Sequence, residues 1–342
     1  MSEHETGAAG AGFGAFLARP WRCWLLAAAA LMVAAAPAGA LAQAYPVKPL
    51  RMLVGAPPGG TTDIVARAVG TKLSEALGQP VVVENRTGAG GLIGHDFVAK
   101  AAPDGYTLLL GNSASLAVSV SMYAKMPYNP ITDFAPITEL AAGQLVLVAH
   151  PGLNVTNVAQ LIELAKTKQG SLNAGLSAVG SIHHLLTESM KFKAGVKWTN
   201  VPYKGSGPML TDLIGGQTDF AFDNIPSSLQ FIKAGKLRGL AVSGTVRTPL
   251  LPDLPTLIES GLAGVEGVAW HGLLAPPGTP KAIIDRLHAE AVKVLRAPEM
   301  VTYLAGLGLD GIGNTPAEFA AFIRDENVKW AKVAKEAGAK IE

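Results

Sequence analysis

The stretch with the clearest potential for chemistry is residues 54–63, VGAPPGGTTD, where an apolar run meets a Pro-Pro-Gly-Gly turn and then a helical pattern. Pro57 and Pro58 fix their own φ angles and donate no N–H. Gly59 and Gly60 accept positive φ and let a ligand approach the backbone closely. Because the first N–H groups of a helix lack intrahelical acceptors, this corner could hold an anion such as a carboxylate. It could also be an ordinary strand-turn-helix corner without a ligand.

Residue patterns that support catalysis are missing from the rest of the sequence. Six histidines follow residue 42, and none lies four residues from another on a helix face; His183 and His184 are adjacent. No GxSxG elbow and no DxDxDG calcium loop occurs. The sole cysteine, Cys23, lies in the N-terminal segment, which excludes disulfides and thiolate metal sites from the remainder. We therefore predict no catalytic residue, no metal and no cofactor.

The N-terminal segment has the pattern of an export signal. Arg19 and Arg22 precede an apolar run that ends in small residues, APAGALAQA. This predicts a signal peptide over residues 1–42, cleaved near Ala42 or Ala44, with a retained membrane anchor as the alternative. The net charge of +2 indicates neither a nucleic-acid partner nor a membrane-surface partner.

The elements that must position the turn form an α/β pattern. From residue 45 onward, apolar runs alternate with helical patterns. Two long apolar segments, 140–150 and 265–275, are expected to cross in antiparallel directions between two domains. Residues 306–311, GLGLDG, match GxGxxG by letter, but no strand leads into them and we predict a turn. Strands are expected at residues 50–54, 81–84, 106–110, 172–174, 198–203 and 237–243. Thr315, Pro316 and Glu318 predict a capping box, with proline at the first helical position, at the start of the last helix.

Two further corners carry small polar residues at the ends of predicted elements. Asn112 and Ser113 follow a predicted strand, which is where open α/β sheets bind ligands, although both could simply cap the loop. Gly180 and Ser181 begin another predicted helix. The second pair forms an anion-receptive corner resembling the first.

Seven segments of the chain, in their order along the sequence, resemble one protein family. The chain is similar, from about Tyr45 to its C-terminus, to the periplasmic receptors of tripartite tricarboxylate transporters of the Bug type. The segments that carry this resemblance are YPVKPLRMLVGAPPGGTTD, GQPVVVENRTGAGGLIG, KAAPDGYTLLLGNSAS, GSIHHL, NVPYKGSGPMLTDLIGGQTDFAFDN, LPDLPTLIESG and WHGLLAPPGTP.

The resemblance implies a two-lobed α/β fold like that of type II periplasmic binding proteins, with a ligand cleft between lobes joined by two crossover strands. Residues 43–145 and 265–342 would form the first lobe, and residues 146–264 the second. The implied function is a monomeric periplasmic receptor that captures a small organic carboxylate and delivers it to a membrane permease. That carboxylate would be a di- or tricarboxylate, an aromatic acid or an acidic amino acid. A ligand-presenting receptor for a sensor kinase and an enzyme on the same fold are the alternatives.

The resemblance also implies site residues. Asp223 would accept a hydrogen bond from a ligand hydroxyl or amine, or would cap the hinge. Many members carry an aromatic residue where Ala56 stands, so a bulkier ligand or a more hydrated cleft is expected. Tyr203 and His184 match further positions that shape the pocket. The ligand-binding positions carried over from the family loops are Pro58, Gly59, Gly60, Thr61, Thr62, Asn112, Ser113, Gly180 and Ser181.

Overall fold

The structure, a computed structural model, describes residues 45–123 and 125–338. The predicted signal peptide and its cleavage sites lie outside these residues. From Pro46 onward the chain forms one compact unit. In the described ranges, none of the helices has the length and apolar character needed to cross a membrane.

The first part of the chain builds a parallel βαβ arrangement. The strands β1 (Leu50–Val54), β2 (Val81–Asn85) and β3 (Thr107–Asn112) pair in the order β2-β1-β3. They are connected by α2 (Thr61–Leu77) and by η1 (Ala89–Gly91) with α3 (Leu92–Ala99). β1 is buried except at Arg51, as its four apolar residues predict for a parallel strand covered by helices. Its carboxyl end leads directly into the Pro-Pro-Gly-Gly turn.

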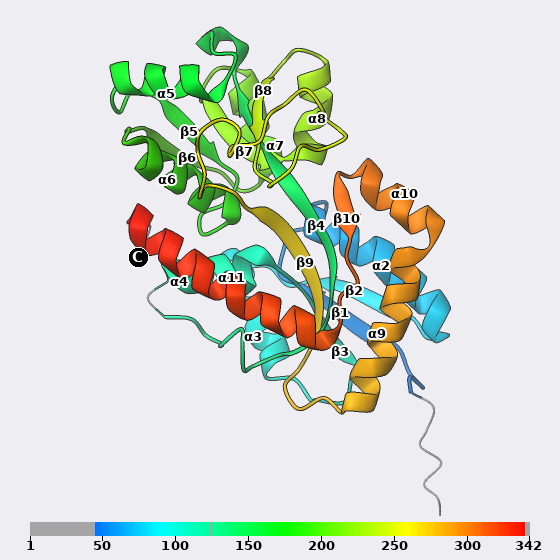
Figure 1. The fold of residues 1–342 in the computed structure, drawn as a ribbon. Helices are drawn as coiled ribbons and strands as arrows, with labels where there is room; N and C mark the ends of the chain where they lie inside the picture. Colours follow the sequence, from blue (N-terminus) through cyan, green and yellow to red (C-terminus); the bar gives the residue numbers. More distant parts are fainter. Residues whose placement is uncertain (1–44, 124, 339–342) are drawn as a thin grey trace, which may run out of the picture. The chain divides into compact units, whose positions relative to one another are not determined.

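Two long antiparallel strands connect the two lobes. In β4 (Ala135–Ala149), residues 135–144 pair with β9 (Val268–Ala275), which also pairs with β3. The remainder of β4, from Leu145 to its end, pairs instead with β7 and β8. β4 therefore changes partners between Gln144 and Leu145, while β4 and β9 run side by side (Figure 1). The two-lobed fold with a double crossover is confirmed, and the exact lobe boundaries stay a prediction.

The second lobe repeats the alternation of strands and helices. Its strands pair in the order β7-β5-β6, in parallel, and β7 and β8 are both antiparallel to β4. The elements are η3 (Pro151–Leu153), α5 (Val158–Thr167), β5 (Asn173–Leu176), α6 (Ile182–Ala194), β6 (Thr199–Pro202), α7 (Ser206–Ile214), β7 (Phe220–Asn224), α8 (Ile225–Lys233) and β8 (Arg238–Val242).

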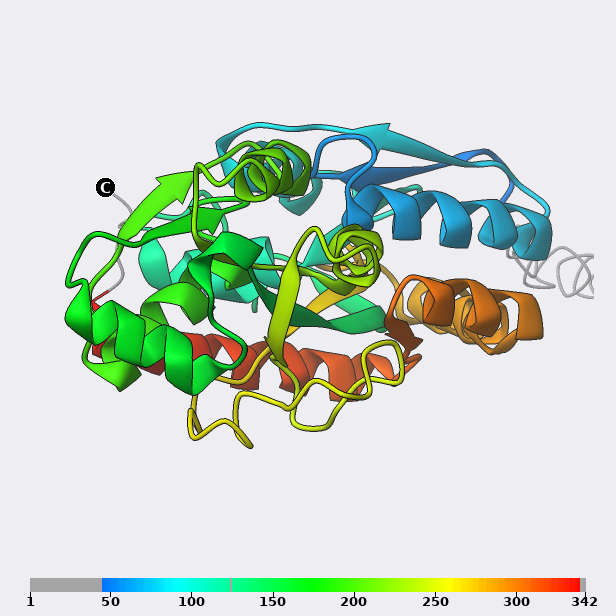
Figure 2. The same ribbon diagram turned by 90° about the horizontal axis from the view of Figure 1, so that it is seen from above.

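The C-terminal part returns to the first lobe. α9 (Lys281–Arg296) packs beside α2, as Figure 2 shows, and is followed by α10 (Pro298–Gly306) and α11 (Pro316–Ala337). The turn predicted for GLGLDG is wrong at its end, because residues 309–311 form β10 (Leu309–Gly311), antiparallel to β4. This pairing is non-local: Leu309 is buried and packs where Gly143 of β4 has no side chain. The predicted capping box at Thr315 is present.

α11 packs against the crossover strands and against elements of both lobes. It packs against β4, against α6, and against η2 (Ala114–Val118) with α4 (Ser119–Met122) (Figure 1). The Phe319 ring meets the Trp270 ring edge-on at 5.8 Å and fills the space above Gly272. Glu326 accepts hydrogen bonds from the indole N–H groups of Trp270 at 3.0 Å and of Trp330 at 2.7 Å. One carboxylate thus connects β9 to α11.

A second buried carboxyl group beside Glu326 makes stability depend on pH. Glu139 of β4 is 5% exposed. Burial, together with the nearby Glu326, raises the pKa of Glu139 from its ordinary value of 4.5 to about 7, although Asn314 donates to its carboxylate. The folded protein therefore keeps a proton that the unfolded chain loses above pH 4.5. This lowers stability as pH rises toward 7, by up to about 3 kcal/mol.

We predict that Glu139→Gln stabilises the protein at pH 8 and has little effect at pH 4.5. The neutral amide loses nothing on burial when the pH rises, and its oxygen still accepts from Asn314. Urea unfolding at the two pH values measures the difference. An equal effect at both pH values would show that Glu139 does not titrate in this range.

Candidate functional site

The Pro-Pro-Gly-Gly loop is held by an internal hydrogen-bond network. Gly59 has a φ of +81°, and its N–H donates to the Asp63 carboxylate at 2.9 Å. Asp63 also accepts from Arg67 at 3.0 Å and from Asn85 at 2.8 Å. Burial disfavours the ionised form of Asp63, but these hydrogen bonds outweigh it and lower the Asp63 pKa. The loop conformation is therefore fixed by a buried, ionised carboxylate.

This network decides which amides of the loop remain available. The N–H of Gly59 is engaged by Asp63, and the N–H of Gly60 points to the carbonyl of Pro57 at 3.4 Å. The N–H groups of Thr61 and Thr62, in the first turn of α2, have no acceptor within the described part of the chain. Gly60 caps this helix without a side-chain hydrogen bond. The anion-receptive donors are thus the amides of the two residues that follow the glycines, Thr61 and Thr62.

In the loop before α6, too, a glycine amide donates to a side chain and the following amides lack acceptors in the described chain. The Gly180 N–H donates to Nδ1 of His184 at 3.3 Å, and the Ser181 hydroxyl accepts from the His184 N–H. The amides of Ser181 and Ile182 have no acceptor among the residues described. The Gly180 carbonyl accepts from the hydroxyl of Ser119 in α4 at 3.0 Å, which connects the two lobes. His184 therefore supports the loop and does not line the pocket described below, and its role in shaping the site stays a prediction.

The end of β3 contributes two polar side chains, of which only Ser113 lacks a hydrogen-bond partner in the described residues. Asn112 donates to the Thr62 hydroxyl at 3.3 Å and accepts from the Ser115 N–H at 3.1 Å. Ser113 is buried, and its hydroxyl has no partner in the described residues. The sequence predicted this strand end as a ligand-facing position, and the structure places it next to the first turn of α2.

These three corners meet at one small pocket of about 120 Å³ between the lobes. Among the predicted site residues, it brings together Thr61, Thr62, Asn112, Ser113 and Ser181. Pro58, Gly59, Gly60 and Gly180 do not line it. That the lining residues bind a ligand stays a prediction. The full lining is Thr61, Thr62, Asn112, Ser113, Ala114, Ser181, Ile182, His183, Asn224, Ala269 and His271.

Asp223 lies outside the lining. It is fully buried, and its carboxylate accepts hydrogen bonds from the hydroxyls of Ser206, Ser227 at 2.6 Å and Ser228 at 2.7 Å. These serines begin α7 and lie in the first turn of α8, so Asp223 holds both helices against β7. Because Asp223 is fully buried and outside the lining, a contact with a ligand hydroxyl or amine would need a rearrangement of the surrounding residues.

The two remaining pocket-shaping candidates also lie outside the lining. The Ala56 carbonyl accepts from Asn85 at 3.0 Å, which belongs to the network that fixes the loop. The Tyr203 hydroxyl donates to Asp212 at 2.8 Å. Burial, with the Asp212 carboxylate, raises the pKa of Tyr203 to about 12. Any effect of these residues on the ligand is therefore indirect in this conformation.

Sequence reasoning missed six pocket residues: Ala114, Ile182, His183, Asn224, Ala269 and His271. In β9, Trp270 and Gly272 face α11, so Ala269 and His271 face the opposite side of the sheet, because side chains alternate along a strand. His271 pairs in register with Asn112, which puts both on the pocket side. The alternation in AWHG could have indicated His271 once the core role of Trp270 was known.

The pocket contains no lysine, arginine, aspartate or glutamate in its lining. Its two histidines are buried, and burial lowers the pKa of His271 to about 4. Burial also lowers the pKa of His183, against the opposing effects of the Asp223 carboxylate and the Asn224 side chain. Both imidazoles are therefore neutral near pH 7. An anion in this pocket would meet backbone amides, hydroxyls and neutral rings.

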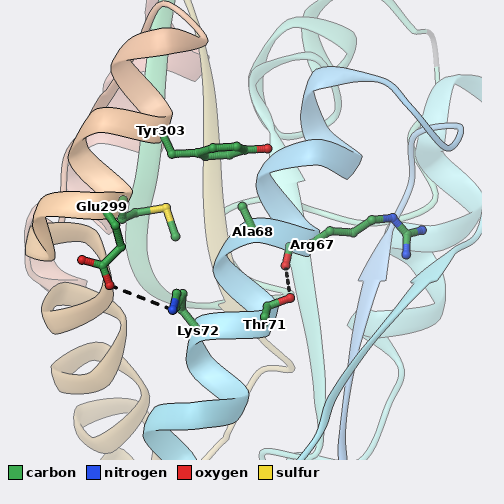
Figure 3. Close-up of a pocket in the computed structure, with 7 residues that line it drawn as sticks. Arg67, Ala68, Thr71, Lys72, Glu299 and Tyr303 are labelled. Carbon is green, nitrogen blue, oxygen red and sulfur yellow. Dashed lines mark hydrogen bonds and ion pairs between the residues drawn. The ribbon is translucent and has the colours of Figure 1, made fainter.

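A larger groove of about 450 Å³ lies elsewhere, between α2 and α10 (Figure 3). Tyr303 lies across from Ala68, and Lys72 forms a 4.0 Å ion pair with Glu299. These charges are exposed, so water screens the pair and it contributes little to stability. None of the predicted site residues lines this groove. Among the residues described, no cluster of three or more histidine, cysteine, aspartate or glutamate side chains could hold a metal ion.

Comparison with known proteins identifies the family. A family profile described as "Tripartite tricarboxylate transporter family receptor" matches residues 65–339. The chain belongs to this receptor family. Protein BugT of Bordetella pertussis is 40% identical to this receptor over 301 residues, covering 88% of this chain and 92% of BugT.

Solved structures of relatives share the fold. The R. palustris protein Rpa4515, solved with adipate, superposes on this receptor with a TM-score of 0.82 at 38% identity, over 87% of this chain and 100% of that one. MatC from Rhodopseudomonas palustris, with bound malate, gives 0.78 at 32% identity, over 84% and 99%. The periplasmic binding protein BugD gives 0.79 at 35% identity, over 87% and 100%.

We predict that Asp223→Ala destabilises the receptor by about 3 kcal/mol, because three serine hydroxyls lose a buried acceptor. Asp223→Asn should cost less, since the amide oxygen retains part of this acceptor. Urea unfolding of both variants measures the order. If Asp223→Ala unfolded like the unmodified receptor yet lost ligand affinity, a direct role with the ligand would replace the structural one.

Proposed function

We propose that this receptor is an extracytoplasmic solute-binding protein that captures a small organic carboxylate in the pocket and delivers it to a membrane permease. One observation carries the proposal: the N-termini of α2 and α6, from different lobes, line the same pocket with amides that lack acceptors in the described chain. Each such terminus favours a negative charge by about 0.3–1 kcal/mol.

The chemistry of the lining supports an anion of modest size. Two amides at the start of α2 can each donate to one carboxylate, and the Ser113 hydroxyl adds a donor beside them. With no cationic side chain in the lining, the charge is balanced by dipoles that the fold already holds in place. The relatives solved with adipate and with malate support a carboxylate as the solute.

Delivery to a permease follows from the family and from the expected export. The family description names a receptor of a transporter, and the N-terminal sequence predicts a signal peptide. A periplasmic receptor that binds its solute between two lobes offers the permease a surface that differs between the open and closed forms. The proposed function is therefore binding and transfer of the solute without its chemical conversion.

Binding measurements on the mature chain test this proposal. We expect titration calorimetry with adipate, malate, succinate, citrate, benzoate and aspartate to find at least one ligand that also raises the unfolding temperature. At a ligand concentration of 100 times Kd, stability should rise by about 2.7 kcal/mol. Absence of binding across all these acids would contradict the proposal.

Substitution of proline at Thr61 tests the role of the amides. Thr61 is the first helical residue after Gly60, whose φ of −78° and ψ of 163° suit a residue before proline. Thr61→Pro removes an N–H that has no acceptor in the described structure and leaves the helix intact. Thr61→Ala, which removes only the side chain, is the matched control.

We predict that Thr61→Pro binds the carboxylate about 10- to 100-fold more weakly than Thr61→Ala, because one charge-assisted hydrogen bond is lost. The unfolding temperatures of the two variants should agree. Equal affinities of Thr61→Pro and Thr61→Ala would show that this amide does not contact the ligand.

A further inference from the structure

The pocket holds two buried imidazoles, and three of their four ring nitrogens lack hydrogen-bond partners in the described protein. Nε2 of His183 and both ring nitrogens of His271 are buried and have no hydrogen-bond partner in the described protein. His183 is 8% exposed and His271 is 4% exposed, and both line the pocket. Burying a polar atom without a hydrogen bond costs free energy, so a ligand that pairs with these nitrogens is favoured.

The hydrogen bonds of Ser181 fix the tautomer of His183. The Ser181 hydroxyl donates its single proton to the Ala178 carbonyl at 2.7 Å, so it can only accept from Nδ1 of His183 at 3.3 Å. Nδ1 therefore carries the hydrogen of the neutral ring. Nε2 is left as a bare acceptor, which cannot pair with a carboxylate oxygen unless it gains a proton.

The ionisable groups around these rings are already paired or face away from them, so the proton comes from solvent. The negative charge of Asp223 on β7 favours the protonated form of His183, but its carboxylate already accepts hydrogen bonds from three serine hydroxyls. On α6 itself, Glu188 and Lys191 pair with each other. On the elements packed against β9, Glu139 pairs in register with Gly272 on the face opposite His271, where Glu326 binds Trp270. On α2, Asp63 is bound to Arg67.

From this arrangement we propose that His183 and His271 contact the ligand and take up a proton when a dicarboxylate binds. The inference rests on the proposed function and narrows it. Helix N-termini from both lobes favour an anionic group at each end of the ligand, and the pocket contains no fixed cation. The proton from solvent converts an imidazole acceptor into a cationic donor beside the second carboxylate. A monocarboxylate of the same length offers no such partner and binds more weakly.

Calorimetry in two buffers tests the proton uptake. The mature receptor is titrated at pH 7.5 with malate, succinate and adipate, and with butyrate and hexanoate as monocarboxylates of matching length, in phosphate and in Tris. Because the two buffers differ in ionisation enthalpy, the difference in heat gives the number of protons bound. We expect about one proton per dicarboxylate and none for butyrate or hexanoate. Dicarboxylate affinity should fall about tenfold for each unit of pH above 7.

Glutamine variants test which of the two rings takes up the proton. His183→Gln and His271→Gln keep a hydrogen-bonding side chain that cannot be protonated, and one or both should abolish the proton uptake. His150→Gln is the matched control, because His150 lies outside the pocket and its Nδ1 accepts from the Gly152 N–H. Unfolding temperatures show whether each variant is folded, and the proton count of the unmodified receptor stands without them.

Three results would overturn the inference. Dicarboxylates that bind without proton uptake, uptake that persists in both glutamine variants, or preference for the monocarboxylates would each do so while leaving carboxylate binding itself intact. Failure of every acid to bind would instead overturn the proposed function, so the two failures are distinguishable.

Discussion

The backbone amides that begin α2 and α6 are the constraint on which the site depends. An unpaired N–H costs free energy when it is buried, so these amides must face a space that water or a ligand can enter. Two helices from different lobes place such groups at the same pocket, and their N-terminal dipoles make that space favourable for negative charge. The pocket is therefore anion-receptive before any side chain is considered.

The same local hydrogen-bond pattern precedes both helices. Gly59 donates to Asp63 and Gly180 donates to His184, in each case to a side chain four residues ahead. Each glycine has positive φ, at +81° and +75°, so its amide turns back toward the first helical turn. The side chain accepts from the glycine that precedes the helix, and the amides without acceptors in the described chain are those of Thr61 and Thr62 at α2 and of Ser181 and Ile182 at α6. The glycines thus shape the loop, and the residues after them provide the binding groups.

Prediction from sequence succeeded where the signal was local. The limits of β1 and the capping box at Thr315 follow from periodicity and from short-range hydrogen bonds. The two crossover strands pair non-locally, but their long apolar runs mark them in the sequence. Prediction failed at two other non-local contacts. β10 depends on Gly143 of a distant strand, and the face of His271 depends on Trp270 meeting α11. The binding roles of the predicted site residues stay a prediction.

The absence of lysine and arginine from the pocket lining has a consequence for selectivity and release. A fixed cation would attract any anion at long range and would hold it during lobe opening, whereas amide dipoles act only within the first helical turn. If the lobes open to release the proposed ligand, the α2 and α6 termini separate, and each carboxylate keeps only the terminus that it contacts. Under the proposed proton uptake, an imidazole between these termini is cationic only while a second carboxylate stabilises it. The proposed site would therefore hold a cation in the loaded form and lose it on release, which suits the proposed role in delivery.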